Sequence, residues 1–364
     1  MKTISMPPPL EMERAYLDRD ASYDGLFFLG VRTTRIFCRP TCPARKPLPK
    51  NVEYFPTAAS AVAAGYRACK RCRPQQLDDR PPWADVLLAE VDSQPAIHIS
   101  DEDLKARGID PSTVRRYFLR RHGMTFQAFT RSRRLSAALK TIRERAPLDD
   151  AVFASGYDSH SGFRDAFART FGEAPGRFKK GDAVFLSWLR SPVGPLLAGA
   201  TDEGVCLLEF NDVHDGRRLD VQLASLAKLF DAPVVPGSND HLRTLEAELA
   251  AYFDGTLRRF SVPLVYPGTP FQRRVWEQLL AIPFGETCSY EALAIAAGAP
   301  RGSRAVGGAN GANRIAIVIP CHRVINKSGS LGGYGGGLRR KQYLLDLERS
   351  GRKACLDFGS SPRP

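Results

Sequence analysis

The clearest hydrophobic pattern lies in the middle of the chain, where apolar residues recur every three or four positions and short breaks separate the repeats. Acidic residues at 101–103 precede Leu104 and predict a helix start, Gly108 ends this helix, and Pro111 opens a second one. The same order returns in residues 148–171. A short helix, a turn and a longer helix are typical of a helix-turn-helix, so the pattern predicts two such units.

The C-terminal half follows other periodicities. Short apolar runs such as Val205–Phe210 alternate with helical stretches such as residues 242–253, which predicts an α/β region. Residues 271–349 are expected to be mainly helical, with glycine-rich connections at residues 307–308 and 332–337.

Stretches rich in proline, glycine or charged residues separate these patterns, and we interpret them as domain boundaries. They are residues 77–82, 178–182 and 266–270. The sequence therefore predicts a multidomain protein with regions at residues 1–78, 85–181, 183–265 and 271–350.

The net charge of +13 over 364 residues is unevenly distributed. Residues 38–80 carry nine Lys/Arg against three Asp/Glu (+6), and residues 105–145 carry twelve against two (+10). Residues 183–350 total only +2. Basic segments of this kind favour a polyanionic partner, so we expect separate modules that bind double-stranded DNA.

No apolar run approaches the roughly 18 residues that a membrane span requires. The first 20 residues also lack the apolar core of a secretory signal. We therefore expect a cytoplasmic protein with no membrane partner. Eight cysteines in such a chain indicate metal or catalytic use rather than a disulfide framework.

Four of these cysteines form two close pairs. Cys38 and Cys42 are separated by three residues, Cys69 and Cys72 by two, and 26 residues lie between the pairs. This spacing predicts one Zn²⁺ per chain held by four thiolates, with Zn–S bonds of about 2.3 Å. An iron-sulfur cluster or unligated thiols are the alternatives. In so small a domain the metal would supply on the order of 10 kcal/mol of folding free energy.

A second chemical candidate is Cys321, which lies beside His322 in the short motif of residues 319–324. A free thiol titrates near about pH 8.5 and is a weak nucleophile at neutral pH unless a base or a positive environment activates it. His322 is the candidate base. Two alternatives are a structural pair, with a buried cysteine beside a packed histidine, and the nucleophile and base of a hydrolase. The remaining cysteines are expected to be structural: Cys206, Cys288 and Cys355.

The segments at residues 31–42 and 69–72 resemble the N-terminal domain of the bacterial Ada family of methyltransferases and regulators. The resemblance implies that Cys38 is both a zinc ligand and the acceptor of a methyl group from a DNA methylphosphotriester. The alternative is a purely structural zinc site, which is the commoner role of four-cysteine sites in proteins in general.

The same resemblance bears on DNA binding by the zinc domain. By position it implies phosphate contacts for Thr34, Arg45 and Arg67, whereas Pro43 stands where the best-known family member has a basic residue. Four thiolates around Zn²⁺ give a local charge of −2, and methylation of one thiolate leaves −1. Because repulsion from the DNA backbone then falls, methylation of Cys38 is expected to tighten DNA binding.

Residues 101–180 resemble an all-α DNA-binding domain of the AraC type, including its terminal segment at residues 172–178. In such a domain one helix of each unit can enter the major groove. The neutral second unit is expected mostly to position the domain. For the arginines of the first unit, a solvent-exposed face without a DNA contact is the alternative. Candidate DNA contacts in the first unit are Ser112, Thr113, Arg115, Arg116, Arg120 and Arg121.

Residues 183–350 resemble O6-alkylguanine-DNA alkyltransferases over their whole length. The motifs that carry this resemblance are residues 283–290, 304–309 and 320–324, together with Asn313. The implied fold is an α/β ribonuclease H-like subdomain at residues 183–265 and a helical, winged-helix-like catalytic subdomain at residues 271–350.

The alkyltransferase resemblance also implies roles for single residues. Cys321 accepts the alkyl group, His322 acts as a base through a bridging water, and Glu348 holds the imidazole. Since the target base must leave the duplex, Arg304 is expected to fill the vacated stack. The resemblance further implies that Tyr290 aids rotation of the phosphate, that Asn313 orients the site, and that Gly335 affects the preferred alkyl size, because several relatives have a larger side chain there.

The resemblances together cover residues 20–349 and imply a bifunctional protein. It would repair O6-methylguanine and O4-methylthymine at Cys321 and methylphosphotriesters at Cys38, with each acceptor working once. Methylated Cys38 would make it a transcriptional activator of the adaptive response to alkylation. We also expect a monomer with RNA polymerase as a partner. The alternative is a zinc-dependent transcription factor whose C-terminal domain senses damage without transfer.

Overall fold

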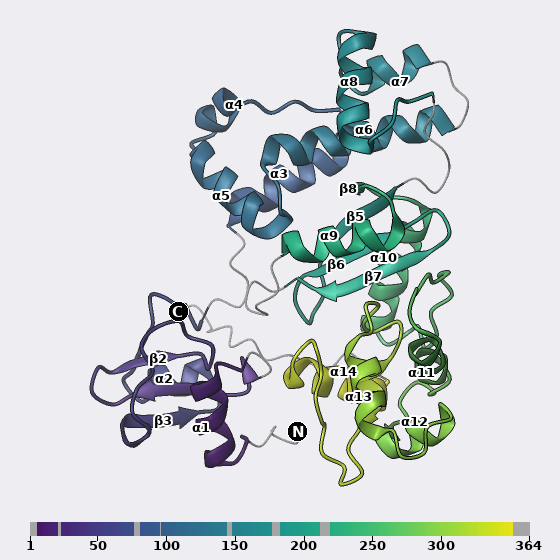
Figure 1. Cartoon of the computed structure of the whole chain (residues 1–364). Coiled ribbons are helices and arrows are strands. Elements are labelled where there is room, and N and C mark those ends of the chain that lie inside the picture. Colours follow the sequence, from purple (N-terminus) through teal and green to yellow (C-terminus); the bar gives the residue numbers. More distant parts are fainter. Residues whose placement is uncertain are drawn as a thin grey trace.

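The computed structural model describes residues 6–20, 23–75, 81–94, 96–143, 148–176, 183–211 and 219–351. An N-terminal lobe is followed by a helical part and by an α/β part that continues into C-terminal helices (Figure 1). Most of the expected boundaries at residues 77–82 and 178–182 lie outside the described residues, as does Cys355. Within the described ranges, no helix is both long and apolar enough to cross a bilayer.

A four-stranded sheet forms the N-terminal lobe. Its strands are β1 (Phe28–Val31), β2 (Ile36–Cys38), β3 (Val52–Phe55) and β4 (Arg67–Ala68), in the order β3-β1-β2-β4. The other elements of the lobe are α1 (Pro9–Asp18), the 3-10 turn η2 (Pro49–Asn51) and α2 (Ala58–Ala63). Because side chains alternate across a strand, Phe37 packs in an aromatic cluster on one face of the sheet while Cys38 joins the four cysteines on the other.

The helical part confirms both predicted helix-turn-helix units. Its helices are α3 (Pro82–Ser93), α4 (Asp101–Ala106), α5 (Pro111–His122), α6 (Phe126–Arg143), α7 (Leu148–Ala154) and α8 (His160–Phe171). Ser100 and Asp103 form a capping box at the start of α4, and Asp110 caps α5. Gly108 between them adopts φ +71°, a conformation that glycine reaches without the Cβ strain of other residues.

The α/β part contains a second four-stranded sheet. Its strands are β5 (Val184–Leu189), β6 (Leu196–Ala200), β7 (Val205–Phe210) and β8 (Val234–Pro236), in the order β7-β6-β5-β8. β5, β6 and β7 are antiparallel neighbours, whereas β8 is parallel to β5. The helices of this part are α9 (Leu219–Phe230) and α10 (Asp240–Phe253).

The C-terminal part is mainly helical, as expected. It comprises α11 (Pro270–Leu280), β9 (Cys288–Ser289), α12 (Tyr290–Ala296), α13 (Ser303–Gly311), η3 (Cys321–Arg323), β10 (Val324–Ile325) and α14 (Leu338–Ser350). The prediction of a connection at residues 307–308 is wrong, because both glycines lie inside α13. Packing overrides their low helix propensity: Val306 and Ala309 are buried, and the Trp276 indole of α11 donates to the Ala309 carbonyl at 2.9 Å.

Hydrophobic contacts join the second helix-turn-helix unit to the α/β part. One cluster of buried side chains includes Phe163 and Phe167 of α8 together with Phe185 of β5. The Ser136 hydroxyl of α6 donates to the Pro236 carbonyl of β8 at 2.9 Å, so α6 lies along this edge of the sheet. Trp188 of β5 packs against both the core of the first unit and the core of the sheet.

Candidate zinc centre and cysteine acceptor site

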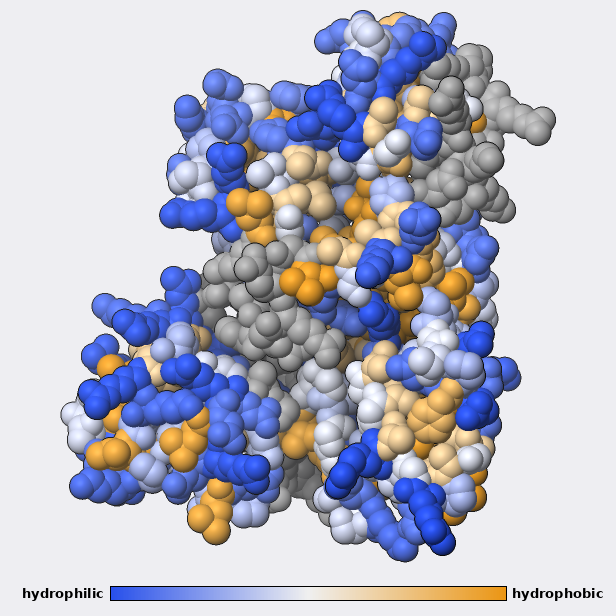
Figure 2. All heavy atoms as spheres, viewed as in Figure 1, coloured by the Kyte–Doolittle hydropathy of each residue, from blue (hydrophilic) through white to orange (hydrophobic). Residues whose placement is uncertain are grey.

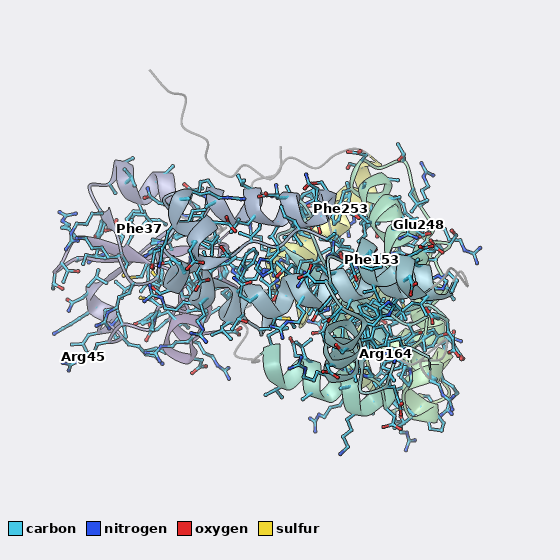
Figure 3. All side chains as sticks on the ribbon, turned by 90° about the horizontal axis from the view of Figure 1, so that it is seen from above. Phe37, Arg45, Phe153, Arg164, Glu248 and Phe253 are labelled. Atoms are coloured by element: carbon cyan, nitrogen blue, oxygen red, sulfur yellow. The ribbon has the colours of Figure 1, made fainter. Side chains whose placement is uncertain are left out.

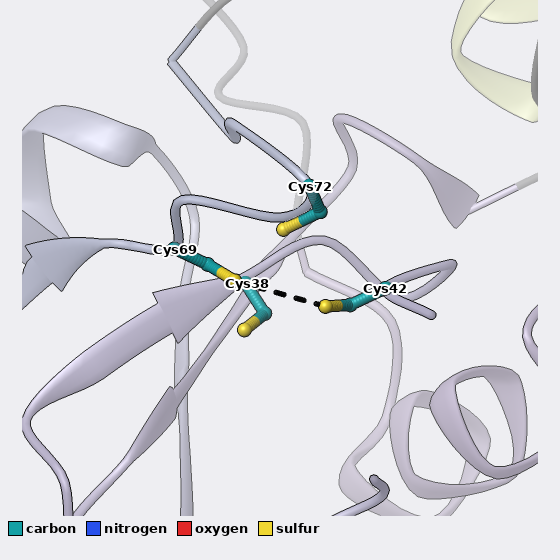
Figure 4. Close-up of side chains that lie close together, drawn as sticks. All are labelled: Cys38, Cys42, Cys69 and Cys72. Carbon is teal, nitrogen blue, oxygen red and sulfur yellow. Dashed lines mark hydrogen bonds between the residues drawn. The ribbon is translucent and has the colours of Figure 1, made fainter. Parts of the chain in front are cut away.

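The parallel pairing of β2 and β4 brings the two cysteine pairs together. The Cys69 amide donates to the Phe37 carbonyl at 3.0 Å, which places Cys69 beside Cys38 at the ends of the paired strands. All four thiols are buried, and their sulfur atoms lie within 4.8 Å of one another. The Sγ atoms of Cys42 and Cys69 are 3.9 Å apart (Figure 4).

This arrangement fits a zinc ion. Tetrahedral coordination with Zn–S bonds of about 2.3 Å places the sulfur atoms about 3.8 Å apart, close to the separation of Cys42 and Cys69. The backbone amide of Arg39 also points at Cys72 Sγ at 3.5 Å. The predicted cofactor is confirmed: the four cysteines are arranged to hold one Zn²⁺.

Polar contacts anchor the loop between the first two ligands. The Thr41 hydroxyl donates to Asp24 Oδ2 at 2.6 Å, and the Thr41 amide contacts the other carboxylate oxygen at 3.3 Å. Outside this loop, the side chains of Thr34, Arg45 and Arg67 are exposed. Arg45 projects from the outer edge of the lobe (Figure 3), and much of the visible surface of the lobe is hydrophilic (Figure 2).

The residues expected to contact DNA from α5 lie in two environments. The hydroxyls of Ser112 and Thr113 both donate to Oδ2 of the N-cap residue Asp110, at 2.6 and 2.7 Å, so both hydroxyls are engaged at the start of the helix. Arg115 and Arg116 are exposed. At the other end of α5, the Arg121 side chain is partly buried and its carbonyl accepts a hydrogen bond from Asn211 of the α/β part at 3.3 Å. The side chain of Arg120 lies outside the described atoms.

Cys321 lies at the start of η3, buried in the main hydrophobic cluster with 6% of its surface exposed. Asn313, after α13, donates from Nδ2 to both Cys321 Sγ at 3.2 Å and the Ile319 carbonyl at 2.9 Å. Burial raises the pKa of the Cys321 thiol, and the Asn313 contact offsets part of this increase. The resting thiol is therefore protonated at neutral pH and needs a base.

His322 and Glu348 form a fully buried pair beside this thiol. His322 Nε2 lies 2.8 Å from Glu348 Oε1, and both side chains are 0% exposed. Burial lowers the pKa of His322 although Glu348 favours its charged form, so the resting imidazole is neutral. His322 Nδ1 is buried and has no hydrogen-bond partner among the described residues. The ring therefore has one nitrogen fixed by the carboxylate and one available to take a proton.

Glu348 has more partners than the sequence suggested. Arg323 Nε donates to Oε2 at 2.9 Å and its Nη2 to Oε1 at 3.0 Å. The Tyr252 hydroxyl donates to Oε1 at 2.7 Å, and the Gly285 amide to Oε2 at 3.1 Å. Burial alone would raise the pKa of Glu348, but His322 and Arg323 together hold it well below its ordinary value. The carboxylate is therefore ionised.

Lys341 and Tyr334 line the same region and were also missed by the sequence prediction. The buried Lys341 ammonium donates to the carbonyls of Val324 at 2.5 Å and Gly333 at 3.3 Å, and burial lowers its pKa to about 8. The Tyr334 hydroxyl is buried with no hydrogen-bond partner among the described residues. Lys341 stands seven positions before Glu348, two turns earlier on the same face of α14, which was a usable sequence signal.

The remaining predicted residues lie around this centre. The Tyr290 hydroxyl, at the start of α12, donates to the Gly333 carbonyl at 3.4 Å. Arg304 is exposed in the first turn of α13. A Cβ at position 335 would meet nothing within 4 Å, whereas one at the neighbouring Gly336 would lie 2.3 Å from the Phe210 ring. A larger side chain at 335 therefore has room here, and one at 336 has none.

A buried thiol with a histidine–carboxylate pair is the arrangement of a cysteine nucleophile, and the same chain carries two helix-turn-helix units and a four-cysteine metal centre. Together these features are those of a DNA-binding protein with a reactive cysteine. Family models match three stretches of the chain. Residues 11–75 match the metal binding domain of Ada, residues 104–181 a helix-turn-helix domain, and residues 270–350 the DNA binding domain of 6-O-methylguanine DNA methyltransferase. The chain belongs to the Ada family.

Whole-chain relatives support this assignment. The regulatory protein ada of Salmonella typhimurium is 36% identical over 343 residues, covering 91% of this chain and 94% of the relative. The bifunctional transcriptional activator/DNA repair enzyme Ada of Escherichia coli is 32% identical over 92% of this chain and 95% of its own length. A methylated-DNA–protein-cysteine methyltransferase of Methanosarcina barkeri is 39% identical over 46% of this chain and 98% of its own.

Proposed function

We propose that this protein repairs methylated DNA by irreversible transfer to two of its own cysteines and that one transfer converts it into a transcriptional activator. Cys321 takes the methyl group of O6-methylguanine and O4-methylthymine, and Cys38 that of methylphosphotriesters. The observation that carries the proposal is the buried Cys321 thiol beside His322, whose Nε2 is fixed by Glu348 and whose Nδ1 is unpartnered among the described residues.

This geometry supports the following route for transfer to Cys321. The thiol proton of Cys321 moves through an intervening water to His322 Nδ1. The ionised carboxylate of Glu348 stabilises the imidazolium that forms. The thiolate, with Asn313 Nδ2 donating to it, attacks the methyl carbon. The S–C bond forms, the C–O bond breaks, and the guanine leaves with the bonding electrons. The proton held by His322 then passes through water to the guanine, and the ring returns to its neutral form. The thioether product cannot be hydrolysed like an acyl thioester, so each molecule acts once.

The target base has to leave the duplex before this attack, at a cost of a few kcal/mol. Arg304, exposed on α13, fills the vacated stack, and Tyr290 assists the rotation of the phosphate. Gly307 and Gly308 leave little bulk on α13, which permits close approach to the minor groove, only about 6 Å wide.

At the N-terminal site, Cys38 is the acceptor and the bound zinc is held by Cys38, Cys42, Cys69 and Cys72. Zinc favours the thiolate form of its ligands and so supplies the nucleophile at neutral pH. Thr34, Arg45 and Arg67 contact the DNA backbone. Methylation of Cys38 removes one negative charge and tightens DNA binding, and the helix-turn-helix units then position the protein on promoter DNA through α5.

We further propose that the protein acts as a monomer in the cytoplasm and contacts RNA polymerase when bound to a promoter. The exposed Arg115 and Arg116 support DNA binding by α5. Ser112, Thr113, Arg120 and Arg121 complete the contacts that we assign to this helix.

Labelled-peptide mapping tests the proposed function. After incubation with DNA that carries labelled methyl groups, the wild-type chain is expected to carry label on Cys321 from O6-methylguanine and on Cys38 from methylphosphotriesters. Cys321→Ala should lose only the first label, whereas Cys288→Ala, at a half-buried cysteine of the same subdomain, should lose neither. Label on neither acceptor would refute the proposal, and unchanged DNA affinity after Cys38 methylation would refute the activator role.

The rate of transfer to Cys321 is expected to depend on pH through His322. Transfer needs the neutral imidazole, and burial lowers the pKa of His322 below its ordinary value of 6.5. The rate should therefore be retained at pH 6.5 and fall only at lower pH, as protonation removes the base. Single-turnover rates between about pH 5 and 8 measure this fall, which we call the acid limb of the profile. His322→Gln has no ionisable ring and should show no such limb. A midpoint above 6.5 would contradict the assignment.

A further inference from the structure

Tyr252 contacts the catalytic carboxylate from outside the catalytic subdomain. It lies in α10 of the α/β part, is 0% exposed, and donates from its hydroxyl to Glu348 Oε1 at 2.7 Å. The two residues are 96 positions apart. Tyr252 is thus a second side chain, besides that of Arg323, that donates to the carboxylate holding His322.

We propose that Tyr252 is a positioning residue for transfer to Cys321, acting through Glu348 to set the basicity of His322. This inference rests on the proposed role of Cys321 as acceptor. Tyr252 is not a catalytic residue, because its hydroxyl touches the carboxylate rather than the thiol or the substrate.

The geometry shows how the hydroxyl would act. Oε1 receives three donors, from Tyr252, His322 and Arg323, while Oε2 receives two, from Arg323 and Gly285. A hydrogen bond donated to Oε1 partly offsets the negative charge of the carboxylate. The electrostatic attraction between Glu348 and the imidazolium is then weaker than it would be without that donor. Tyr252 therefore weakens the stabilisation of charged His322 and adds to the effect of burial, which favours the neutral ring in the resting protein.

The Tyr252 hydroxyl stays protonated, and so remains a hydrogen-bond donor, over the pH range of the assay. Burial, and then the charge of Glu348, raise the pKa of Tyr252 well above its ordinary value, so the hydroxyl keeps its proton. The other titratable or charged groups that bear on the pair are on η3 and α14. They are Cys321, Arg323 and Lys341, with Tyr334 on the loop before α14.

The ring of Tyr252 is held independently of its hydroxyl. Its centroid lies 5.4 Å from that of Phe253, the α10 residue labelled in Figure 3, 5.4 Å from that of Phe260, and 6.1 Å from that of Phe284. Tyr252→Phe keeps these contacts, and Glu348 keeps four of its five hydrogen bonds. The variant therefore removes one donor from Oε1 and leaves the packing in place.

The test compares pH profiles of full-length wild type, Tyr252→Phe and the control Tyr157→Phe, which removes a buried hydroxyl without a hydrogen-bond partner in the described residues of the helix-turn-helix domain. In Tyr252→Phe the acid limb of transfer to Cys321 should move to higher pH by roughly half a unit, about threefold in rate on the limb. Transfer to Cys38 in the same molecules should not change. The His322 ring, followed by NMR without any substrate, should titrate at correspondingly higher pH.

A Tyr252→Phe profile that superimposes on the wild-type profile would overturn the proposal, whether or not thermal stability falls. Absence of transfer in the wild type would instead refute the proposed function, and the His322 titration would still decide the role of Tyr252. If the variant does not fold, the Tyr252 hydroxyl proton of the wild type is assigned through its own ring protons. That resonance should shift as His322 is protonated, and a constant position would also overturn the proposal.

Discussion

Removal of zinc is expected to unfold the N-terminal lobe while the rest of the chain stays folded. Four buried thiols fill one face of the small sheet, and their cluster includes only a few other buried side chains, such as Tyr16, Leu29 and Val52. Without the metal these thiols have to keep their protons or repel one another as thiolates. The loss of metal binding should cost on the order of 10 kcal/mol, more than a lobe of this size can supply from its core.

Hydrogen exchange after chelation measures this effect strand by strand. Protection of β1, β2 and β3 should disappear, while that of β5, β6 and β7 should persist. Cys72→Ala should reproduce the result in the presence of zinc. Cys206→Ala removes a more deeply buried thiol from β7 and should leave zinc content and β1 protection unchanged. Retention of protection in β1 after complete removal of zinc would contradict the prediction.

Replacement of Glu348 by glutamine is expected to impair both stability and transfer. The amide removes the negative charge that faces Arg323 and brings an NH₂ donor among groups that are themselves donors. Breaking a buried ion pair on one side typically costs about 3–5 kcal/mol. Charged His322 also loses its counterion, so transfer to Cys321 should slow by about 100-fold or more.

Thermal unfolding and single-turnover transfer measure the two consequences of Glu348→Gln. The matched control is Glu246→Gln, an exposed position of α10, which should change neither quantity appreciably. Transfer to Cys38 should remain at the wild-type rate in both variants. A Glu348→Gln protein with full transfer activity at Cys321 would show that the carboxylate does not support the base.

The sequence predicted those features whose partners are close along the chain. Spacing alone grouped Cys38 with Cys42 and Cys69 with Cys72. Because zinc in a tetrahedral site needs four ligands, the two pairs could be predicted to bind one metal ion. Helices α4 and α5 likewise followed from local signals at residues 101–103, Gly108 and Pro111. Within each cysteine pair and at each of these helix ends, the residues that decide the structure lie within a few positions of one another.

The contacts around Glu348 were less predictable because they join distant segments. Glu348 lies 26 residues from His322, and only a family resemblance suggested the pair before the structure. Tyr252 lies in a different subdomain, and nothing in the periodicity of α10 separates its hydroxyl from that of any packed tyrosine. Gly307 and Gly308 were misplaced in a connection because local propensity ignores the packing of α11 and α12 against α13.

The position of Trp188 between two hydrophobic cores also has a spectroscopic consequence. The chain has three tryptophans, at positions 83, 188 and 276. Trp83 packs on Tyr117 of α5, Trp276 is bonded to α13, and Trp188 lies at the junction of the helical and α/β parts. The N-terminal lobe contains none. A change in tryptophan fluorescence on methylation of Cys38 would therefore originate outside the lobe that was modified, and single Trp→Phe variants would identify which part of the chain responded.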